Sequence, residues 1–531
     1  MSFISVAFII FIFAVCLIYY LVPLKIRWCV LLVASYIFFW LNSEWLLLIM
    51  FAATLITWGT GRLVDRNMQK ASRYLETEGA GFSKAEKKAY QKKEKARRRA
   101  FTVVGVILVL GILLFLKYFN FFASVSNVLL KHVGLKIGKL SLLLPVGISF
   151  YTLQAIAYMT DVYRGKAAAE RNLLHFMLFM SYFPQILQGP IPRYNQLAGQ
   201  LVEGHRFDYD RFCKGIQLII WGFFKKMVIA DRIAIPVSEV FGNYPAYHGL
   251  LVFLAAAGYG VQVYADFSGC MDIARGFSQM VGIDLELNFL QPYFSTSVED
   301  FWRRWHITLG GFMRDYVFYP LSLSKAFNSL TKRSRKIFGD FFGKKVGPFL
   351  AMFIVYFLVG FWHGPASKYI AYGLWNGIFI SGSILLADVY EKGRKTLRVR
   401  ERSVCWRLFQ MMRTFVIISF GRFFSNAIGT HAALSMMRSV FDRTRDLSFL
   451  VNGSLVDLGL DNANWMVLIV SIVLLLLVDL LHEKGIEIRE GISRQNLVFR
   501  WIIYCCAVAV IVLFGVYGPN FNAASFIYEQ F

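Results

Sequence analysis

The sequence predicts an all-α, polytopic integral membrane protein with roughly ten to thirteen embedded helices, some of them re-entrant or interfacial. Of its 531 residues, 57% are hydrophobic and 17% are aromatic, more than a soluble domain of this size needs for its core. Apolar runs near bilayer-spanning length recur along the chain, at residues 3–21, 103–116, 250–264, 349–361, 465–481 and 501–516. Because no soluble domain or flexible linker interrupts them, we expect residues 1–531 to form a single membrane domain.

The charged residues gather between the apolar runs. The formal net charge is +24, which in a membrane protein indicates cytoplasmic loops and not a nucleic-acid surface. The first run lacks a basic n-region and has no cleavage site before Pro23, so we expect it to remain as the first helix. Lys25 and Arg27 follow it, and a hairpin over residues 28–60, turning at residues 41–44, leads into a basic segment. Both charge signals favour an N-terminus outside the cytoplasm.

The basic segment at residues 62–99 carries thirteen Lys/Arg and five Asp/Glu and is predicted to be helical and cytoplasmic. Ser83 and Glu86 form a capping-box pattern, and Glu94 lies four residues before Arg98. The helix is either a solvated surface element or a contact with anionic lipid head groups. Two further basic stretches, predicted to be cytoplasmic loops, lie at residues 325–345 and 392–407.

Several classes of protein are disfavoured. The seven cysteines are scattered without C-x-x-C spacing, so we expect neither a disulfide framework nor a metal site. No internal repeat is visible, which disfavours a secondary transporter. A polysaccharide or small-molecule transporter remains the alternative of another class, because it too would contain broken helices and buried polar groups.

Two histidines are the leading candidates for chemistry, because polar groups inside a membrane are costly. His363 ends an apolar helix at residues 358–365 (LVGFWHGP), where the Gly-Pro pair interrupts the helix. The structural alternative is a core histidine bonded to a carbonyl freed by that break. His306 follows a predicted helix start at Thr296 and Ser297, each of which has an acid three residues later.

The helix before His306 carries two i,i+4 ion pairs, Glu299 with Arg303 and Asp300 with Arg304. Its aromatic residues, of the kind found at membrane interfaces, are Phe301, Trp302 and Trp305. We expect this helix to lie in the interface plane or at a funnel wall and to carry His306 toward the membrane interior. The alternative is a surface helix whose histidine has no role.

Other polar or broken segments could line a cavity. Pro and Gly inside the apolar runs at residues 144–154 and 188–193 suit re-entrant backbone. Asp266 is a carboxylate in an apolar neighbourhood, and a helix cap is its simplest interpretation. The H-x4-D spacing of His205 and Asp210 lies in a polar loop and is interpreted as accidental.

Taken in order, five motifs resemble the membrane-bound O-acyltransferase (MBOAT) family, in particular its bacterial alginate O-acetylation and D-alanyl-lipoteichoic acid branch. They are PVGISF at 145–150, QGPI at 188–191, YADFSG at 264–269, DFWRRWH at 300–306 and GFWHG at 360–364. The resemblance implies an MBOAT-type fold with its core at residues 140–380, and catalytic roles for His363 and His306. Substrate or tunnel candidates in the same motifs are Trp305, Trp362, Asp266, Gln188, Ser149 and Asp300.

The resemblance also implies the reaction. It is O-acyl transfer, with acetyl from a cytoplasmic thioester such as acetyl-CoA as the first choice and no bound cofactor. The acceptor would be an extracellular or cell-wall polysaccharide, or an intermediary extracytoplasmic acetyltransferase, at the cytoplasmic (inner) membrane. D-alanyl transfer from a carrier protein to teichoic acid is the alternative. His363 would act as general base, while His306 would orient the substrate or stabilise the oxyanion.

Overall fold

The computed structural model describes residues 4–186, 189–442, 447–450 and 453–517. Within these ranges the regular structure is helical, and the one extended pairing is an isolated antiparallel bridge between Phe289 and Trp305. The all-α prediction is confirmed. The chain divides into two compact units: unit 1 is Met1–Ile216 with Ala274–Glu286, and unit 2 is Gln217–Ile273 with Leu287–Phe531. The expectation of a single membrane domain stays a prediction.

Unit 1 begins with three helices that follow the predicted order. α1 (Val6–Leu21) ends before Lys25, as expected. α2 (Arg27–Ser43) and α3 (Leu47–Glu76) are separated at Glu44, whose φ of 44° turns the chain within the predicted residues 41–44. The remaining helices of this part of the chain are α4 (Lys84–Leu113), α5 (Phe119–Leu130), α6 (Ile148–Tyr163), α7 (Leu173–Ser181), α8 (Phe183–Ile186), α9 (Tyr194–Val202) and α10 (Tyr209–Phe223).

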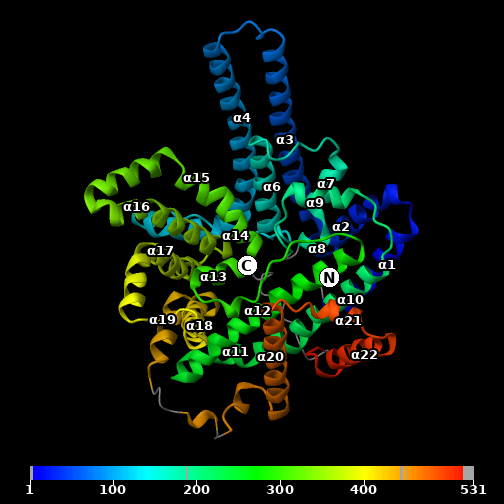
Figure 1. Cartoon of the computed structure of the whole chain (residues 1–531), viewed down its shortest axis with the longest axis vertical. Coiled ribbons are helices and arrows are strands. Elements are labelled where there is room, and N and C mark those ends of the chain that lie inside the picture. Colours follow the sequence, from blue (N-terminus) through cyan, green and yellow to red (C-terminus); the bar gives the residue numbers. More distant parts are fainter. Residues whose placement is uncertain (1–3, 187–188, 443–446, 451–452, 518–531) are drawn as a thin grey trace. The chain divides into compact units, whose positions relative to one another are not determined.

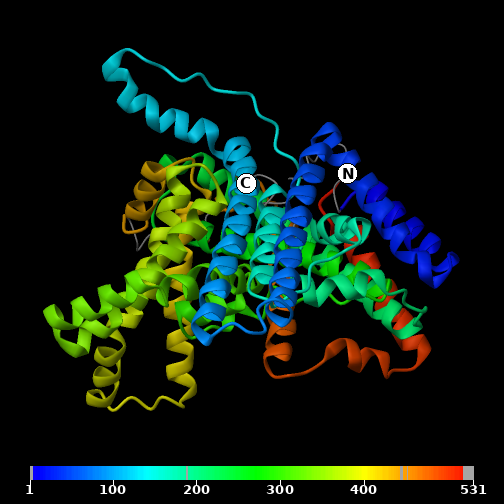
Figure 2. The same cartoon turned by 90° about the horizontal axis from the view of Figure 1, so that it is seen from above.

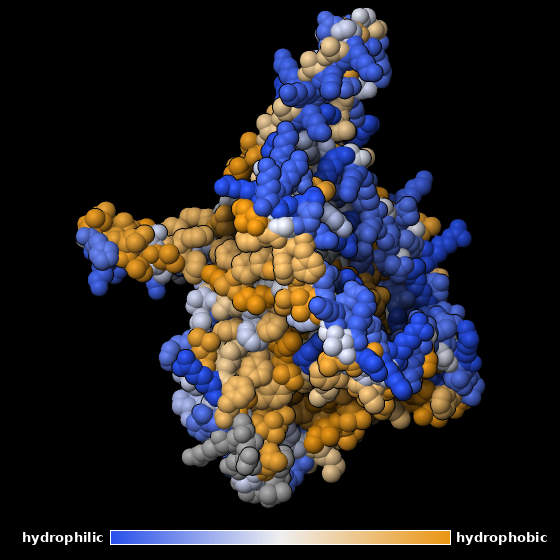
Figure 3. Space-filling view, turned by 60° about the vertical axis from the view of Figure 1, so that its left-hand side comes forward, coloured by the Kyte–Doolittle hydropathy of each residue, from blue (hydrophilic) through white to orange (hydrophobic). Residues whose placement is uncertain are grey.

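Helices α3 and α4 lie antiparallel in a long projecting hairpin (Figure 1). The predicted capping box at its turn is confirmed, because Ser83 N donates to Glu86 Oε2 (2.8 Å) and Glu86 N donates to Ser83 Oγ (3.3 Å). Hydrophilic side chains gather along the end of the hairpin (Figure 3). The helix predicted from the capping box and from the spacing of Glu94 and Arg98 is confirmed as α4. Glu94 is buried and accepts a hydrogen bond from Asn67 of α3 (2.5 Å), so its partner lies on the neighbouring helix.

The two Pro- and Gly-containing segments are only partly irregular. Residues 144–147 precede α6, whereas residues 148–154 belong to it, and the re-entrant backbone expected there stays a prediction. Residues 135–145 belong to no helix and form the long connection from α5 to α6 visible in Figure 2. Gly147 precedes α6 with φ 72°, and a Cβ there would lie 2.1 Å from the Ile186 carbonyl oxygen, so no other residue fits without a shift. Residues 189–193 are also non-helical.

Unit 2 holds the two histidine motifs. Two of its long helices, α16 (Lys325–His363) and α17 (Ser367–Thr396), run side by side in Figures 1 and 2. Gly360 and Gly373 permit their close approach, since a Cβ on Gly360 would lie 2.4 Å from the Tyr369 carbonyl oxygen and 2.8 Å from Gly373 Cα. The other helices that contribute to this unit are α11 (Asp231–Gly242), α12 (Leu250–Met280), α13 (Val298–Arg304), α14 (Ile307–Met313), α15 (Tyr319–Ser322), α18 (Val404–Asn426), α19 (Thr430–Ser439), α20 (Asn462–Glu483), α21 (Ile488–Ser493) and α22 (Leu497–Phe514).

The basic stretches at 325–345 and 392–407 are not the loops that we predicted. Residues 325–345 are helical and belong to α16, which is kinked at Gly339 (φ 70°). Residues 392–407 comprise the end of α17, a short connection and the start of α18. Lys and Arg are good helix formers, so a basic composition alone does not end a helix.

Seven helical segments in the described residues are long and apolar enough to cross a membrane: Leu24–Glu76, Lys84–Val133, Leu250–Met280, Lys325–His363, Ser367–Thr396, Asn462–Glu483 and Leu497–Phe514. The first of these contains both α2 and α3. Helix α22 buries no residue of its own, although almost every position is apolar. A helix with these properties is stable when lipid surrounds it, so the polytopic prediction is confirmed.

Candidate active site

His306 lies in a tight turn and not on the helix expected to carry it. Ser297 caps the start of α13, because its hydroxyl accepts from Asp300 N (3.0 Å) as predicted, but the helix ends at Arg304. His306 has left-handed backbone angles (φ 50°, ψ 54°) and immediately precedes α14. Its side chain is 2% exposed, which rules out the alternative of a surface histidine.

The loop residue Asn288 holds this turn. Its backbone oxygen accepts from Ile307 N (3.1 Å), and its side-chain Oδ1 accepts from Thr308 N (3.0 Å) and Thr308 Oγ1 (3.0 Å). The same Oδ1 lies 3.2 Å from His306 Nδ1. Asn288 is 1% exposed. Sequence reasoning missed this residue, because an asparagine in a loop carries no signal of a distant partner.

His363 is the last residue of α16, and Gly364 follows it with extended angles at the predicted Gly-Pro break. The Trp362 indole contacts both histidines: its ring centroid is 6.0 Å from that of His306 and 5.2 Å from that of His363. Tyr372 of α17 contacts His363 edge-on at 5.8 Å. The structure therefore brings the two predicted histidines together around one aromatic ring.

The electrostatics of His306 follow from its burial. Removal from water, and then the neighbouring His363, hold the pKa of His306 well below its usual range. A neutral imidazole can accept a proton, which is what a general base or a hydrogen-bond acceptor in acyl transfer requires.

The aromatic residues of α13 form part of the core of unit 2, which corrects their interfacial placement. Phe301 and Trp305 are 1% and 2% exposed and stack at 5.4 Å with 16° between their planes. The Arg422 guanidinium of α18 lies 4.7 Å from the centre of a Trp305 ring and donates to the Tyr372 hydroxyl (3.3 Å). Trp302 donates to Asn376 Oδ1 (3.1 Å). Packing against α17 and α18 places Phe301 and Trp305 in the core, whereas Trp302 is partly buried.

Arg422 is a second residue that sequence reasoning missed. It is 3% exposed and reaches Tyr372, which contacts His363. Its position in an otherwise apolar and aromatic stretch of α18 is the signal that could have identified it.

Asp266 is not a helix cap, because it lies in the middle of α12. Its Oδ1 is 2.6 Å from Lys226 Nζ, and Lys226 also pairs with Asp231 at 2.8 Å. Lys225 pairs with Asp272 at 2.6 Å. Both lysines lie in the π-helical segment Phe224–Ala230, and their place inside an apolar run is the signal that could have revealed this cluster.

The other predicted site residues are placed as follows. Asp300 pairs with Arg304 (3.2 Å) and Glu299 pairs with Arg303, both as predicted. These pairs lie along α13 and not in the histidine turn. Ser149 belongs to unit 1, where its hydroxyl accepts from Lys117 Nζ (3.1 Å). Gln188 lies outside the described residues. In the part of the chain that the structure covers, no group of three or more His, Cys, Asp or Glu could hold a metal ion.

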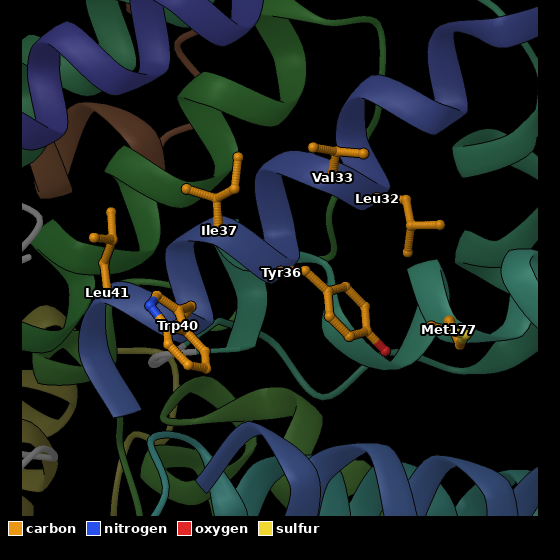
Figure 4. A pocket seen from close by; sticks show the side chains of 7 residues that line it. All are labelled: Leu32, Val33, Tyr36, Ile37, Trp40, Leu41 and Met177. Carbon is orange, nitrogen blue, oxygen red and sulfur yellow. The ribbon is translucent and has the colours of Figure 1, made fainter. Parts of the chain in front are cut away.

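An apolar groove in unit 1 contains none of these residues. Figure 4 shows its lining, which comes from α2 and α7: Leu32, Val33, Tyr36, Ile37, Trp40, Leu41 and Met177. The Tyr36 hydroxyl and the Trp40 indole are its polar groups, and neither titrates near neutral pH. The groove therefore provides no base for acyl transfer.

The helices and the buried histidine pair define a multi-pass membrane protein with an internal histidine site. Residues 169–425 match the model of the family described as "MBOAT, membrane-bound O-acyltransferase family", a range that includes Asn288, His306, His363 and Arg422. The chain belongs to this family, and it is therefore a membrane acyltransferase.

Three relatives place the chain within the family. The probable alginate O-acetylase AlgI of Pseudomonas syringae pv. tomato is 31% identical over 425 residues, covering 80% of this chain and 71% of the relative. The peptidoglycan O-acetyltransferase of Helicobacter pylori is 28% identical, covering 66% and 67%. The teichoic acid D-alanyltransferase of Bacillus subtilis is 26% identical, covering 52% and 67%. The branch predicted from the motifs is confirmed.

Proposed function

We propose that this protein transfers an acetyl group from a cytoplasmic thioester, with acetyl-CoA as the first choice, for O-acetylation of an extracellular or cell-wall polysaccharide. The observation that carries the proposal is the meeting of His306 and His363 around Trp362 inside the family-matched region. Both imidazoles are at most 7% exposed, although each has a polar ring that normally prefers water. Burial of two such rings against the same indole is better explained by chemistry than by packing.

The chemistry assigns His363 the role of general base. It takes the proton of the acceptor hydroxyl as the oxygen attacks the thioester carbonyl carbon, the carbon–sulfur bond breaks, and the thiolate leaves and is protonated. His306 and the surrounding aromatic rings complete the site. A water-poor setting protects the thioester, because little water is present to compete with the hydroxyl.

Acetyl is favoured over D-alanyl by the relatives. The alignment with the probable alginate O-acetylase covers 80% of this chain at 31% identity, whereas that with the D-alanyltransferase covers 52% at 26%. The acceptor is either the polysaccharide or an extracytoplasmic acetyltransferase that passes the group on. The protein needs no bound cofactor in this scheme, and it resides in the cytoplasmic (inner) membrane.

A test uses protein purified in detergent and carbonyl-labelled acetyl-CoA. Transfer of label to an acceptor, or acceptor-dependent release of CoA thiol, supports the proposal when His363→Gln abolishes it. Activity in micelles also excludes transport as its source, because no compartments remain. Release from a D-alanyl carrier thioester but not from acetyl-CoA would overturn the acetyl assignment, and inertness toward both would overturn the reaction.

A further inference from the structure

The side-chain amide of Asn288 can be oriented from its surroundings. The backbone N–H of Thr308 can only donate a hydrogen bond, so the Asn288 atom 3.0 Å away must be the carbonyl oxygen and not the NH2 group. The opposite orientation would place two donors face to face. The NH2 group instead lies 3.5 Å from the sulfur of Met271, a weak acceptor on α12.

This orientation decides which nitrogen of His306 carries a proton. His306 Nδ1 lies 3.2 Å from the same Asn288 oxygen, and an amide oxygen accepts hydrogen bonds but never donates them. Nδ1 must therefore carry hydrogen. In a neutral imidazole, protonation of Nδ1 leaves the lone pair on Nε2.

We propose that Asn288 is a positioning residue that fixes His306 in its Nδ1–H tautomer and makes Nε2 the basic nitrogen. The inference rests on the proposed function and sharpens it. A neutral His306 with a bare Nε2 cannot donate a hydrogen bond from that atom to a developing oxyanion. His306 instead accepts a hydrogen bond at Nε2 and so orients the acceptor hydroxyl whose proton His363 removes.

The backbone contacts support the same role. His306 adopts left-handed angles, which are unfavourable for a residue with a Cβ. Asn288 holds the two residues that follow His306, because its backbone oxygen accepts from Ile307 N and its side-chain oxygen accepts from Thr308 N. The strained residue is kept where its ring meets Phe267 at 4.9 Å and Trp362 at 6.0 Å.

Three charged or titratable groups lie beside the histidine turn or on an element that packs against it. His363 acts on His306 electrostatically. Arg304, two residues before the turn, is engaged by Asp300 and Glu483. Asp266, which precedes Phe267 on α12, is engaged by Lys226.

The first test is spectroscopic and needs no activity. Full-length protein labelled with nitrogen-15 histidine is reconstituted in lipid, and the ring signals of His306 are assigned by their absence in His306→Gln. We expect one protonated and one bare nitrogen at neutral pH, with the proton on Nδ1. An Nε2–H tautomer or a doubly protonated ring would overturn the proposal, even if acyl transfer were confirmed.

The second test separates positioning from simple support of the turn. In Asn288→Asp the carboxylate still accepts from Thr308 N and His306 Nδ1, but its charge raises the pKa of His306. The Nδ1–H tautomer should persist in this variant, and the acid limb of kcat should move to higher pH. The matched control Asn464→Asp makes the same chemical change at the start of α20, beside Arg232, and should not move that limb. If the acid limb of the kcat profile stayed at the same pH in Asn288→Asp, Asn288 would only support the backbone of the turn, and the proposal would be contradicted.

Asn288→Leu removes the acceptor altogether. If it folds, kcat should fall between about 10-fold and 10⁴-fold with little change in the KM for donor, and the tautomers of His306 should mix. Retention of a single Nδ1–H tautomer in folded Asn288→Leu would contradict the proposal. Failure of the proposed function is distinguishable, because it would abolish acyl transfer in the wild-type protein while leaving the tautomer signals intact.

Discussion

Lys226 Nζ lies 2.6 Å from Asp266 Oδ1, and the two side chains are 1% and 2% exposed. Asp231 shares the same ammonium group at 2.8 Å. The residue after Asp266 is Phe267, whose ring meets that of His306 edge-on at 4.9 Å. The ion cluster therefore includes a residue on the same stretch of α12 that packs against the histidine turn. We expect that loss of these ion pairs also disturbs the position of His306.

Replacing Lys226 by Met should destabilise the protein by about 3–5 kcal/mol, because two buried carboxylates lose their counter-charge. Thermal denaturation in detergent measures the effect. The control Arg303→Met breaks the ion pair of Arg303 (70% exposed) with Glu299 (51% exposed). Because both side chains are exposed, this substitution should lower the free energy of unfolding by less than about 1 kcal/mol. Adding Asp266→Asn and Asp231→Asn to Lys226→Met should restore part of the lost stability. If Lys226→Met alone lost no more stability than Arg303→Met, a structural role for the cluster would be contradicted.

Gly360→Ala should reduce both stability and acyl transfer. The added Cβ would lie 2.4 Å from the Tyr369 carbonyl oxygen, so α16 and α17 must separate, and His363 lies three residues further along α16. We expect a loss of about 1–3 kcal/mol, measured by thermal denaturation. Gly382→Ala on α17 meets nothing within 4 Å and should be neutral or slightly stabilising. Equal behaviour of the two variants would show that the helices tolerate separation.

His363→Ala and His363→Gln should both lower acyl transfer by roughly 10²- to 10⁴-fold without preventing expression, because neither side chain is a comparable base at neutral pH. Gln can still hydrogen-bond to a backbone carbonyl freed by the Gly-Pro break. Product formation is measured together with the melting temperature. Near-normal turnover of His363→Gln at wild-type stability would return His363 to a structural role.

Stability should fall on acidification because of His306. Its folded pKa lies below the ordinary value of 6.5, so the unfolded chain binds more protons in the interval between the two values. The contribution of His306 to the free energy of unfolding is therefore complete above pH 6.5, and it is lost as the pH falls from 6.5 toward the lowered folded-state pKa. Melting temperatures of wild type and His306→Gln, compared over this range, isolate the contribution of His306. Parallel curves for the two proteins would contradict the lowered pKa.

His306→Ala should weaken acyl transfer while leaving the protein inserted in the membrane. The turn keeps its other anchors, because Trp305 stacks on Phe301 and Thr308 still donates to Asn288. Turnover is measured at saturating donor and acceptor. Unchanged turnover would remove His306 from the site.

Residues 62–99 should face the cytoplasm, because thirteen Lys/Arg against five acids resist translocation. A cysteine placed at Ala89, an exposed position of α4, should react with an impermeant thiol reagent after cells are permeabilised but not before. The native cysteines must be replaced first, since Cys405, Cys505 and Cys506 are exposed. Labelling in intact cells would reverse the proposed orientation.

The sequence by itself determined the features whose causes are local. Apolar runs identified the membrane helices, because a bilayer requires long stretches without charge. Ser83 and Ser297 marked helix starts, since a cap and its partner lie within one turn. The end of α16 at His363 coincides with a Gly-Pro pair, which disfavours a helix because proline lacks the backbone donor and restricts the residue before it. The same pair at residues 347–348 is accommodated inside α16.

The tertiary structure alone decided which side chains meet. Asn288 reaches His306 across 18 residues and Lys226 reaches Asp266 across 40, and no periodicity predicts either contact. Trp305 was predicted to lie at an interface and is instead buried beneath Arg422. In a soluble helix the apolar face reveals which side packs inward, but a membrane helix is apolar on every side, so its sequence does not specify which face meets a neighbour. Those faces are selected by packing between helices far apart in the chain, and that packing assembles the histidine site.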